Sequence, residues 1–226
     1  MLFGTCNAYD FFTLSLVWSG TSCSSVKNAV PPTPVADGFW PENNDGTRPS
    51  CCNGHKYDQK AIIGLSKDLN TYWPSYSCSS SSACGSVVES NLAYEVHTIL
   101  YETYGRCAMR NDPYNYKTAQ LTYFMAAVSR LVQYNITEIL LNAGYVPSDT
   151  VEYPLEGITS AIKNVLGVTP IVKCNEDSPI KEIQICFIST SLELKECPTY
   201  APSECPSRVK LPIKNVTQGK FSSCIL

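Results

Sequence analysis

Twelve cysteines and two histidines are the residues of this sequence with the most versatile chemistry. The cysteines are spread over the whole chain, and no pair has the C-x-x-C spacing of zinc ribbons or thioredoxin-type sites. With only His55 and His97 beside them, they form a poor set of metal ligands. We therefore expect neither a metal nor another cofactor. An even number of dispersed cysteines predicts a disulfide framework, which persists in oxidising compartments.

Two tripeptides fit the acceptor pattern for N-linked glycans, and they begin at Asn135 and Asn215. Together with the disulfides they favour a secreted or vacuolar protein. A cytosolic protein that has lost its secretion is the alternative. Residues 1–8 are too short for a complete signal peptide, and we interpret them as the remnant of one.

Composition limits the class of protein. Hydrophobic residues make up 44% of the 226 residues and charged residues 16%, a balance that excludes a disordered chain. The length suits one domain, which we assign to residues 9–226. No apolar stretch approaches the ~18 residues of a membrane-spanning helix, so we expect no membrane contact, and we expect a monomer. The formal net charge of −3 offers little of the attraction that drives nucleic-acid binding.

The elements that must position any site follow from the apolar patterns. Apolar residues at helical spacing predict helices at 57–69, 87–104, 113–131, 137–142 and 155–166. Alternating or short continuous apolar runs predict strands at 10–18, 35–40, 171–174, 183–189, 192–197 and 209–213, the second of them ended by Pro41. Strands, then helices, then strands indicate an α+β fold.

Three segments together resemble the ribonuclease T2 family in its plant form. Tyr9-Asp10-Phe11-Phe12 through Trp18 is similar to the family's first strand, Y-D-F-F-x-x-x-x-Q-W-P. Residues 38–46, which read G-F-W-P-E-N-N-D-G, resemble H-G-L-W-P-N-x-x-D-G without its histidine. Residues 167–198 are similar to the closing strands and their cysteines. The resemblance implies a central, mainly antiparallel sheet flanked by helices and stabilised by disulfides.

The resemblance also implies disulfide pairings. Cys186 is expected to join Cys197, and Cys174 to join Cys205. One of Cys51 or Cys52 is expected to join Cys107. The pairing of the remaining cysteines stays open, namely Cys6, Cys23, Cys78, Cys84 and Cys224.

The positions that carry the family's chemistry are altered. The family cleaves RNA by attack of a ribose 2′-OH on the adjacent phosphate, which needs a base, an acid and a cation. Asp37 stands where the histidine of H-G-L-W-P belongs. Aligned on Cys107, the motif H-E-W-x-K-H-G-T-C has its catalytic positions filled by Ile99, Leu100, Thr103 and Tyr104. Val17 replaces the glutamine of the first strand.

No imidazole remains at these positions, and Asp and Tyr normally titrate near ~3.9 and ~10, far from neutral pH. We therefore expect a non-catalytic T2 protein, for which the resemblance implies a storage or defence role with weak RNA or ligand binding. A weakly active ribonuclease is one alternative. A fold repurposed for small-molecule binding, or for new chemistry by Asp37, Tyr101 and Tyr104, is another.

The cleft itself is expected to be lined by aromatic and acidic side chains, namely Trp18, Asp37, Trp40, Tyr101, Tyr104 and Phe124. Ile99 and Leu100 continue an apolar stripe, so its floor could take an apolar small molecule, or could simply have relaxed once catalysis was lost. His97 and Glu102 lie about 140° apart on a helix and do not form a shifted catalytic pair. We expect His97 to be an ordinary, partly buried histidine.

Overall fold

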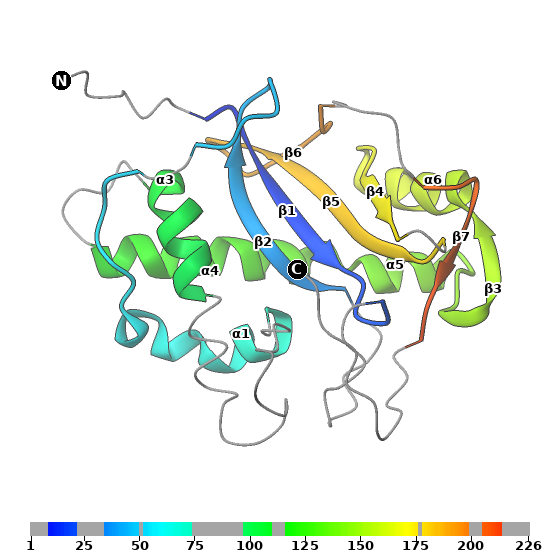
Figure 1. Cartoon of the computed structure of the whole chain (residues 1–226), viewed down its shortest axis with the longest axis horizontal. Helices are drawn as coiled ribbons and strands as arrows, with labels where there is room; N and C mark the ends of the chain where they lie inside the picture. The colour runs from blue at the N-terminus through cyan, green and yellow to red at the C-terminus, as the bar shows by residue number, and fades with distance from the viewer. Residues whose placement is uncertain are drawn as a thin grey trace.

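Strand β1 (Phe11–Val17) lies inside an antiparallel sheet and is buried along its whole length. The computed structural model describes residues 9–21, 34–49, 52–73, 97–109, 116–175, 178–198 and 205–213. The sheet has the order β2-β1-β5-β4, formed with β2 (Val35–Glu42), β5 (Ile180–Ile188) and β4 (Ile171–Cys174). The short β6 (Leu194–Lys195) also pairs with β5 (Figure 1).

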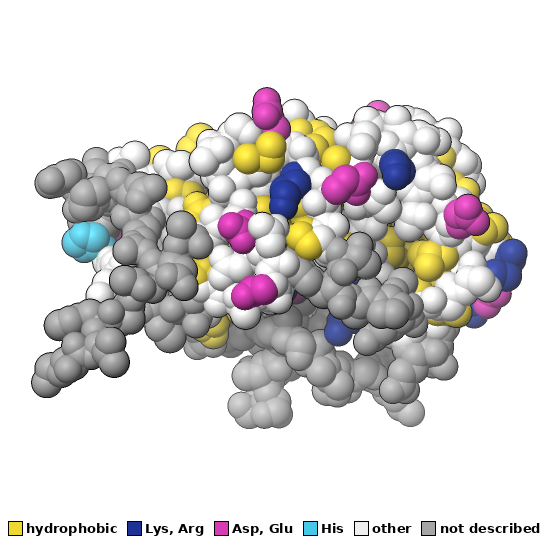
Figure 2. All heavy atoms as spheres, turned by 90° about the horizontal axis from the view of Figure 1, so that it is seen from above, with side chains coloured by type: hydrophobic (Ala, Val, Ile, Leu, Met, Phe, Trp, Pro, Cys, Tyr) yellow, Lys and Arg dark blue, Asp and Glu magenta, His cyan; other side chains and the backbone are white. Residues whose placement is uncertain are grey.

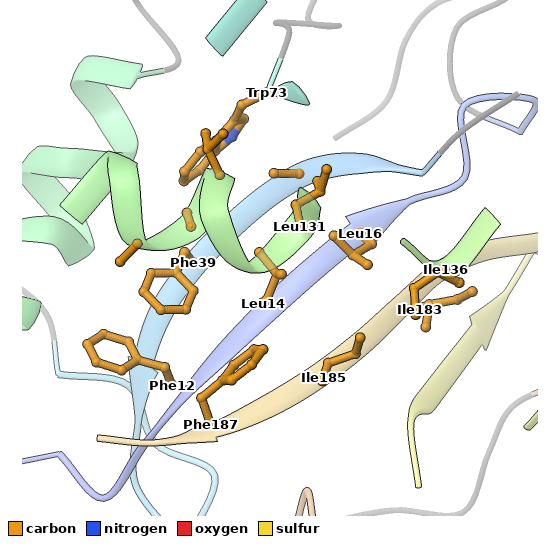
Figure 3. Packing of buried hydrophobic residues seen from close by; sticks show 14 of the residues in the cluster. Phe12, Leu14, Leu16, Phe39, Trp73, Leu131, Ile136, Ile183, Ile185 and Phe187 are labelled. Carbon is orange, nitrogen blue, oxygen red and sulfur yellow. The ribbon is translucent and has the colours of Figure 1, made fainter. Parts of the chain in front are cut away.

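The two faces of this sheet have different chemistry. Phe12, Leu14 and Leu16 of β1 pack against α4 (Tyr116–Gln133), which crosses one face of the sheet (Figures 1 and 3). The intervening side chains, Thr13 and Ser15, point to the opposite face. They are nevertheless only 1% and 0% exposed. We call this opposite side the polar face, and its groups must find hydrogen-bond partners because they are buried.

A group of short helical segments lies beside β2. It comprises η1 (Gln59–Leu65), a 3₁₀ helix, followed by α1 (Ser66–Tyr72). Residues 97–100 are helical and continue into η2 (Tyr101–Gly105), a π-helical turn, and α3 (Arg106–Ala108). β2 is an edge strand, and this group contacts it. The two altered motifs, one on β2 and one on η2, are thereby brought together.

The other end of the molecule holds α5, α6 and a second, two-stranded sheet (Figure 1). α5 (Ile136–Asn142) and α6 (Leu155–Leu166) each end near a glycine with positive φ, Gly144 at 85° and Gly167 at 77°. Such left-handed residues terminate helices at little steric cost when they are glycine. The second sheet pairs β3 (Ser148–Pro154) with β7 (Arg208–Leu211).

Three disulfides join described residues: Cys52–Cys107, Cys174–Cys205 and Cys186–Cys197. These are the pairings that the resemblance implied, with Cys52 chosen over Cys51. The first of them spans 55 residues and links the loop before η1 to α3. Bridges over loops of this length stabilise a fold by about 2–4 kcal/mol each. The other cysteines lie outside the described residues: Cys6, Cys23, Cys51, Cys78, Cys84 and Cys224.

The α+β architecture and most elements are confirmed, with four differences. β2 continues past Pro41 to Glu42, because an edge strand tolerates a residue without an N–H. The helix expected at 57–69 starts as a 3₁₀ helix. The strand expected at 192–197 shrinks to the two residues of β6. β3 was not predicted, since its side chains are mostly exposed and polar and lack an apolar alternation.

Among the described residues, no helix is both long enough and apolar enough to cross a membrane. The first part of the helix expected at 87–104, and residues 1–8, lie outside the described residues.

Candidate functional site

A β-bulge in β2 places Asp37 on the polar face. Ser15 pairs with Gly38 and Leu16 pairs with Ala36, so Asp37 is the extra residue without a partner in β1. A bulge of this kind redirects the side chain of the inserted residue. Ala36 points into the core, whereas the Asp37 carboxylate is close enough to Glu182 of β5 to interact with it electrostatically.

The surroundings of Asp37 disfavour its charged form. Burial raises the pKa of the Asp37 carboxyl, and the nearby Glu182 carboxylate raises it further. Lys181 and Lys173 act in the opposite direction but are weaker. No hydrogen bond reaches the Asp37 carboxylate from the part of the chain that the structure describes. Asp37 is therefore a half-buried carboxyl group that receives no hydrogen bond from the described residues.

Glu182, in contrast, is surrounded by donors. It accepts hydrogen bonds from the Ser15 hydroxyl and the Gln184 amide, and the Lys173 ammonium lies 3.4 Å from its other oxygen. The two carboxyl groups of this patch thus have unlike environments.

A second buried carboxylate, Glu42, organises the other half of the polar face. Its Oε1 accepts from the indole N–H of Trp40 at 3.0 Å and pairs with Arg48 at 2.6 Å. Its Oε2 accepts from the Thr13 hydroxyl at 3.0 Å. The Arg48 guanidinium also lies over the Trp40 ring, 4.2 Å from its centroid. These four side chains form one closed network.

The helical motif meets β2 through aromatic rings. The Tyr104 ring of η2 contacts the Trp40 ring with centroids 5.9 Å apart. Gly105 follows, and a Cβ at this position would lie 2.4 Å from the Tyr101 ring. Only glycine therefore permits the close packing of this turn. π-Helical turns are frequent at functional sites in proteins.

The loop before η1 holds the helical motif in place. Glu102 accepts from the backbone N–H of Tyr57 at 3.1 Å and pairs with Arg106 at 3.0 Å. Arg106 in turn donates to the carbonyl of His55 at 2.9 Å. With the Cys52–Cys107 disulfide, these contacts fix η2 against the loop. Glu102 thus has a structural role, because both of these contacts hold η2 against the loop.

The structure does not bring the six candidate cleft residues together. Trp40 and Tyr104 meet where β2 contacts η2, whereas Asp37 lies on the polar face beside Glu182 of β5. Trp18, Tyr101 and Phe124 are 1%, 3% and 0% exposed and belong to the core. Burial also raises the pKa of the Tyr101 hydroxyl, so Tyr101 stays protonated near neutral pH.

The apolar floor expected from Ile99 and Leu100 does not form. Ile99 is 61% exposed, whereas Leu100 packs against the core. Leu100 therefore faces the interior, whereas Ile99, about 100° away around the helix, lies at the edge of the apolar stripe and faces solvent. Thr103 is partly buried on the same helical segment.

Both histidines of the chain are accounted for in the structure. His97 is 4% exposed, and its Nε2 donates to the Trp73 carbonyl at 3.0 Å. Its ring contacts Trp73 and Phe124 edge-on. Burial lowers the pKa of the His97 imidazole, which keeps it neutral. His55 is exposed on the loop before η1.

Sequence reasoning missed Glu182, Lys181 and Lys173 as neighbours of Asp37, Ser15 and Gln184 as partners of Glu182, and Arg48 as a neighbour of Trp40. The alternation of polar with apolar residues in β1 and β5 was a usable signal for the first group. The register between neighbouring strands decides which polar residues lie near Asp37. A local sequence pattern does not reveal this register.

The arrangement offers carboxylates, tyrosine hydroxyls and a guanidinium, but no imidazole. Among the residues that the structure describes, no group of three His, Cys, Asp or Glu side chains could hold a metal ion. On the face shown in Figure 2, acidic and basic side chains of the described residues are interspersed without a continuous basic stripe.

Replacing Asp37 with Asn should stabilise the protein at neutral pH. The raised pKa of Asp37 means that the folded state favours the protonated form, so its charge costs stability once the pH rises through the folded-state pKa. The advantage of Asp37→Asn should therefore shrink on acidification and vanish below the ordinary Asp pKa of ~3.9. Urea unfolding across this pH range measures it. The exposed Asp68→Asn serves as the control, and destabilisation by Asp37→Asn at neutral pH would contradict the assignment.

His97 should make the fold sensitive to acid in the opposite sense. Its lowered folded-state pKa means that the unfolded chain binds a proton first, so stability falls as the pH drops below the ordinary histidine pKa of ~6.5. His97→Gln removes this term, so its stability relative to wild type should rise as the pH falls from about 7 to 5. His55→Gln, which changes the exposed histidine, serves as the control. Parallel curves for wild type and His97→Gln would show that His97 does not titrate differently on unfolding.

Comparison with known proteins covers nearly the whole chain. The model of the ribonuclease T2 family matches residues 9–197. The extracellular ribonuclease LE of Solanum lycopersicum is 33% identical over 216 residues, which span 90% of this chain and 87% of that protein.

Solved structures give the same result. An RNase-related protein from Calystegia sepium has a TM-score of 0.77 and 45% sequence identity, with 92% of this chain and 100% of that chain covered. Trichomaglin, described as a novel S-like ribonuclease, has a TM-score of 0.74 and 29% identity, with 90% and 98% covered. The strands, the disulfides, the two altered motifs and these similarities lead to one conclusion: this chain belongs to the ribonuclease T2 family.

Proposed function

We propose that this chain is a ribonuclease T2-like protein without ribonuclease activity. The observation that carries the proposal is the absence of an imidazole at the motif positions of β2 and of the helical segment 99–104. The resemblance puts the catalytic groups at Asp37, Ile99, Leu100, Thr103 and Tyr104. Of these residues, none is a histidine or a cation.

Neither histidine can take over the missing role. His97 is buried, neutral and bonded to a backbone carbonyl, with aromatic rings on its sides. His55 lies on the loop that Arg106 and the Cys52–Cys107 disulfide hold against α3. A general base or acid contributes roughly 10²–10⁴-fold to a rate. Loss of both, together with the cation, leaves little beyond background, although such losses do not add.

A storage or defence role fits a stable, disulfide-bonded T2 fold that no longer turns over RNA. A secreted or vacuolar location fits its disulfides, and the name of ribonuclease LE places that relative outside the cell. RNA remains a candidate weak ligand of the polar face. The affinity for RNA is limited by the net charge of −3, by the buried carboxylate of Glu42 and by the partly buried carboxylate of Glu182.

A weakly active ribonuclease is the second candidate, and one observation favours it. The raised pKa of Asp37 brings a carboxyl group closer to the range in which it can donate or accept a proton. Such chemistry would require Asp37, which makes it separable by mutation.

RNA cleavage decides between these candidates. Wild-type protein, Asp37→Ala and an active T2 ribonuclease should be compared from about pH 4.5 to 7.5, the range in which histidine-based enzymes titrate. We expect no cleavage above the Asp37→Ala background. A triple variant, Asp37→His with Ile99→His and Tyr104→His, should gain measurable cleavage because it returns imidazoles to the motif positions. Wild-type cleavage that disappears in Asp37→Ala would refute the proposal.

Glycosylation of Asn135 tests the proposed secretory route. Asn135 is exposed and caps α5 through its Oδ1, an atom that remains an acceptor after a glycan is attached to Nδ2. Protein expressed in plant cells should therefore lose mass on enzymatic deglycosylation. Thr137→Val should abolish the shift at little structural cost, because the buried Thr137 hydroxyl has no hydrogen-bond partner. Thr137→Ser keeps the acceptor pattern and should keep the glycan. An unchanged mass in wild type would count against secretion.

A further inference from the structure

The Arg48 side chain sits in surroundings that resemble a receptor for a planar cation. Its guanidinium stacks over the Trp40 indole at 4.2 Å, and its Nε donates to Glu42 at 2.6 Å. An aromatic face together with a carboxylate is the combination that recognises guanidinium groups, because such a group can stack and donate in its plane at the same time.

Trp40 and Glu42, which receive the Arg48 side chain, are held in place by residues other than Arg48. Glu42 is fixed by the Trp40 N–H and by the Thr13 hydroxyl, both on neighbouring positions of the sheet. The Trp40 ring is held between the Tyr104 ring and Gly38, where a Cβ would lie only 1.8 Å from Cζ3. Glycine at this position is what lets the indole lie flat on the strand. The site therefore keeps its shape when its occupant leaves.

Arg48, which occupies the site, follows a turn at residues 43–47 that several hydrogen bonds stabilise. Asn43 and Thr47 are joined by a backbone and a side-chain hydrogen bond, and Asp45 accepts two further bonds from Thr47. Asn44 is anchored to the Asp10 carboxylate at 2.7 Å. Arg48 follows this turn and its side chain is 35% exposed, whereas Glu42 is 9% exposed. Rotation of the Arg48 side chain alone would open the site to solvent.

We propose that Trp40, Glu42 and Thr13 form a guanidinium-binding site whose resident occupant is the chain's own Arg48. External ligands of this class are small planar cations with N–H donors, such as alkylguanidinium or amidinium compounds. Because Arg48 is tethered, its effective concentration exceeds that of a free ligand, and the wild-type site stays closed. The inference rests on the proposed function in one respect: Tyr104 is taken to pack against the Trp40 ring and not to act in catalysis.

The test is chemical rescue of Arg48→Ala. This variant should be less stable than wild type, because Glu42 is left buried without its cation. Methylguanidinium at millimolar concentration should raise its melting temperature and change its tryptophan fluorescence saturably, with no such effects on wild type. Trp40 reports on the site, because it lies against Arg48, whereas Trp18 and Trp73, the other two tryptophans, pack in the hydrophobic core cluster. Methylammonium, which cannot stack, should rescue poorly or not at all.

Two controls separate a binding site from an ordinary ion pair. Lys195 lies over the Phe11 ring at 4.5 Å, so Lys195→Ala removes a comparable cation from another aromatic ring and should gain no binding. Arg48→Ala combined with Glu42→Gln should lose the rescue. Equal responses to methylguanidinium and methylammonium, a response in Lys195→Ala, or no response in Arg48→Ala would each overturn the proposal. RNA cleavage plays no part in these readouts, so the result is independent of the fate of the proposed function.

Discussion

The central sheet is buried on both sides, and this constraint governs the rest of the structure. One face is filled by aromatic and aliphatic side chains against α4. The other buries Thr13, Ser15, Glu42 and Gln184, whose polar groups would cost stability if left unpaired. The donors of the polar face are therefore arranged around two carboxylates, Glu42 and Glu182. Breaking either set would leave a buried charge without compensation, which is more damaging than losing a surface pair.

The carboxylates that hold the structure together are different residues from those at the motif positions. Glu42, Glu102 and Glu182 are all engaged by hydrogen bonds and basic groups. Among the described residues, Asp37 has electrostatic neighbours only, and the Tyr104 ring packs against Trp40. The polar groups of the junction of β2 and η2 thus serve mainly to hold the sheet, the turn and the helix together.

The sequence revealed much of the fold and part of the site. Repeated apolar spacing located β1, α4, α5 and α6, and the family resemblance supplied three disulfide pairings. β3 was not predicted from the sequence, because an exposed strand lacks an alternation of apolar and polar residues. Trp18, Tyr101 and Phe124 were candidates for the cleft because of their aromatic character, yet aromatic residues also fill cores, and only tertiary packing decides between the two. The π-helical turn and the β-bulge were equally out of reach, because both depend on contacts between distant segments.

The bulge at Asp37 affects which substitutions the sheet tolerates at this position during evolution. A residue that pairs with no position of the neighbouring strand contributes nothing to the register of the sheet, and its replacement leaves the ladder of backbone hydrogen bonds intact. The position that the resemblance associates with chemistry is thus one whose side chain the strand pairing does not constrain. A change of residue there alters local electrostatics but keeps the sheet, so the scaffold can be inherited while this position varies.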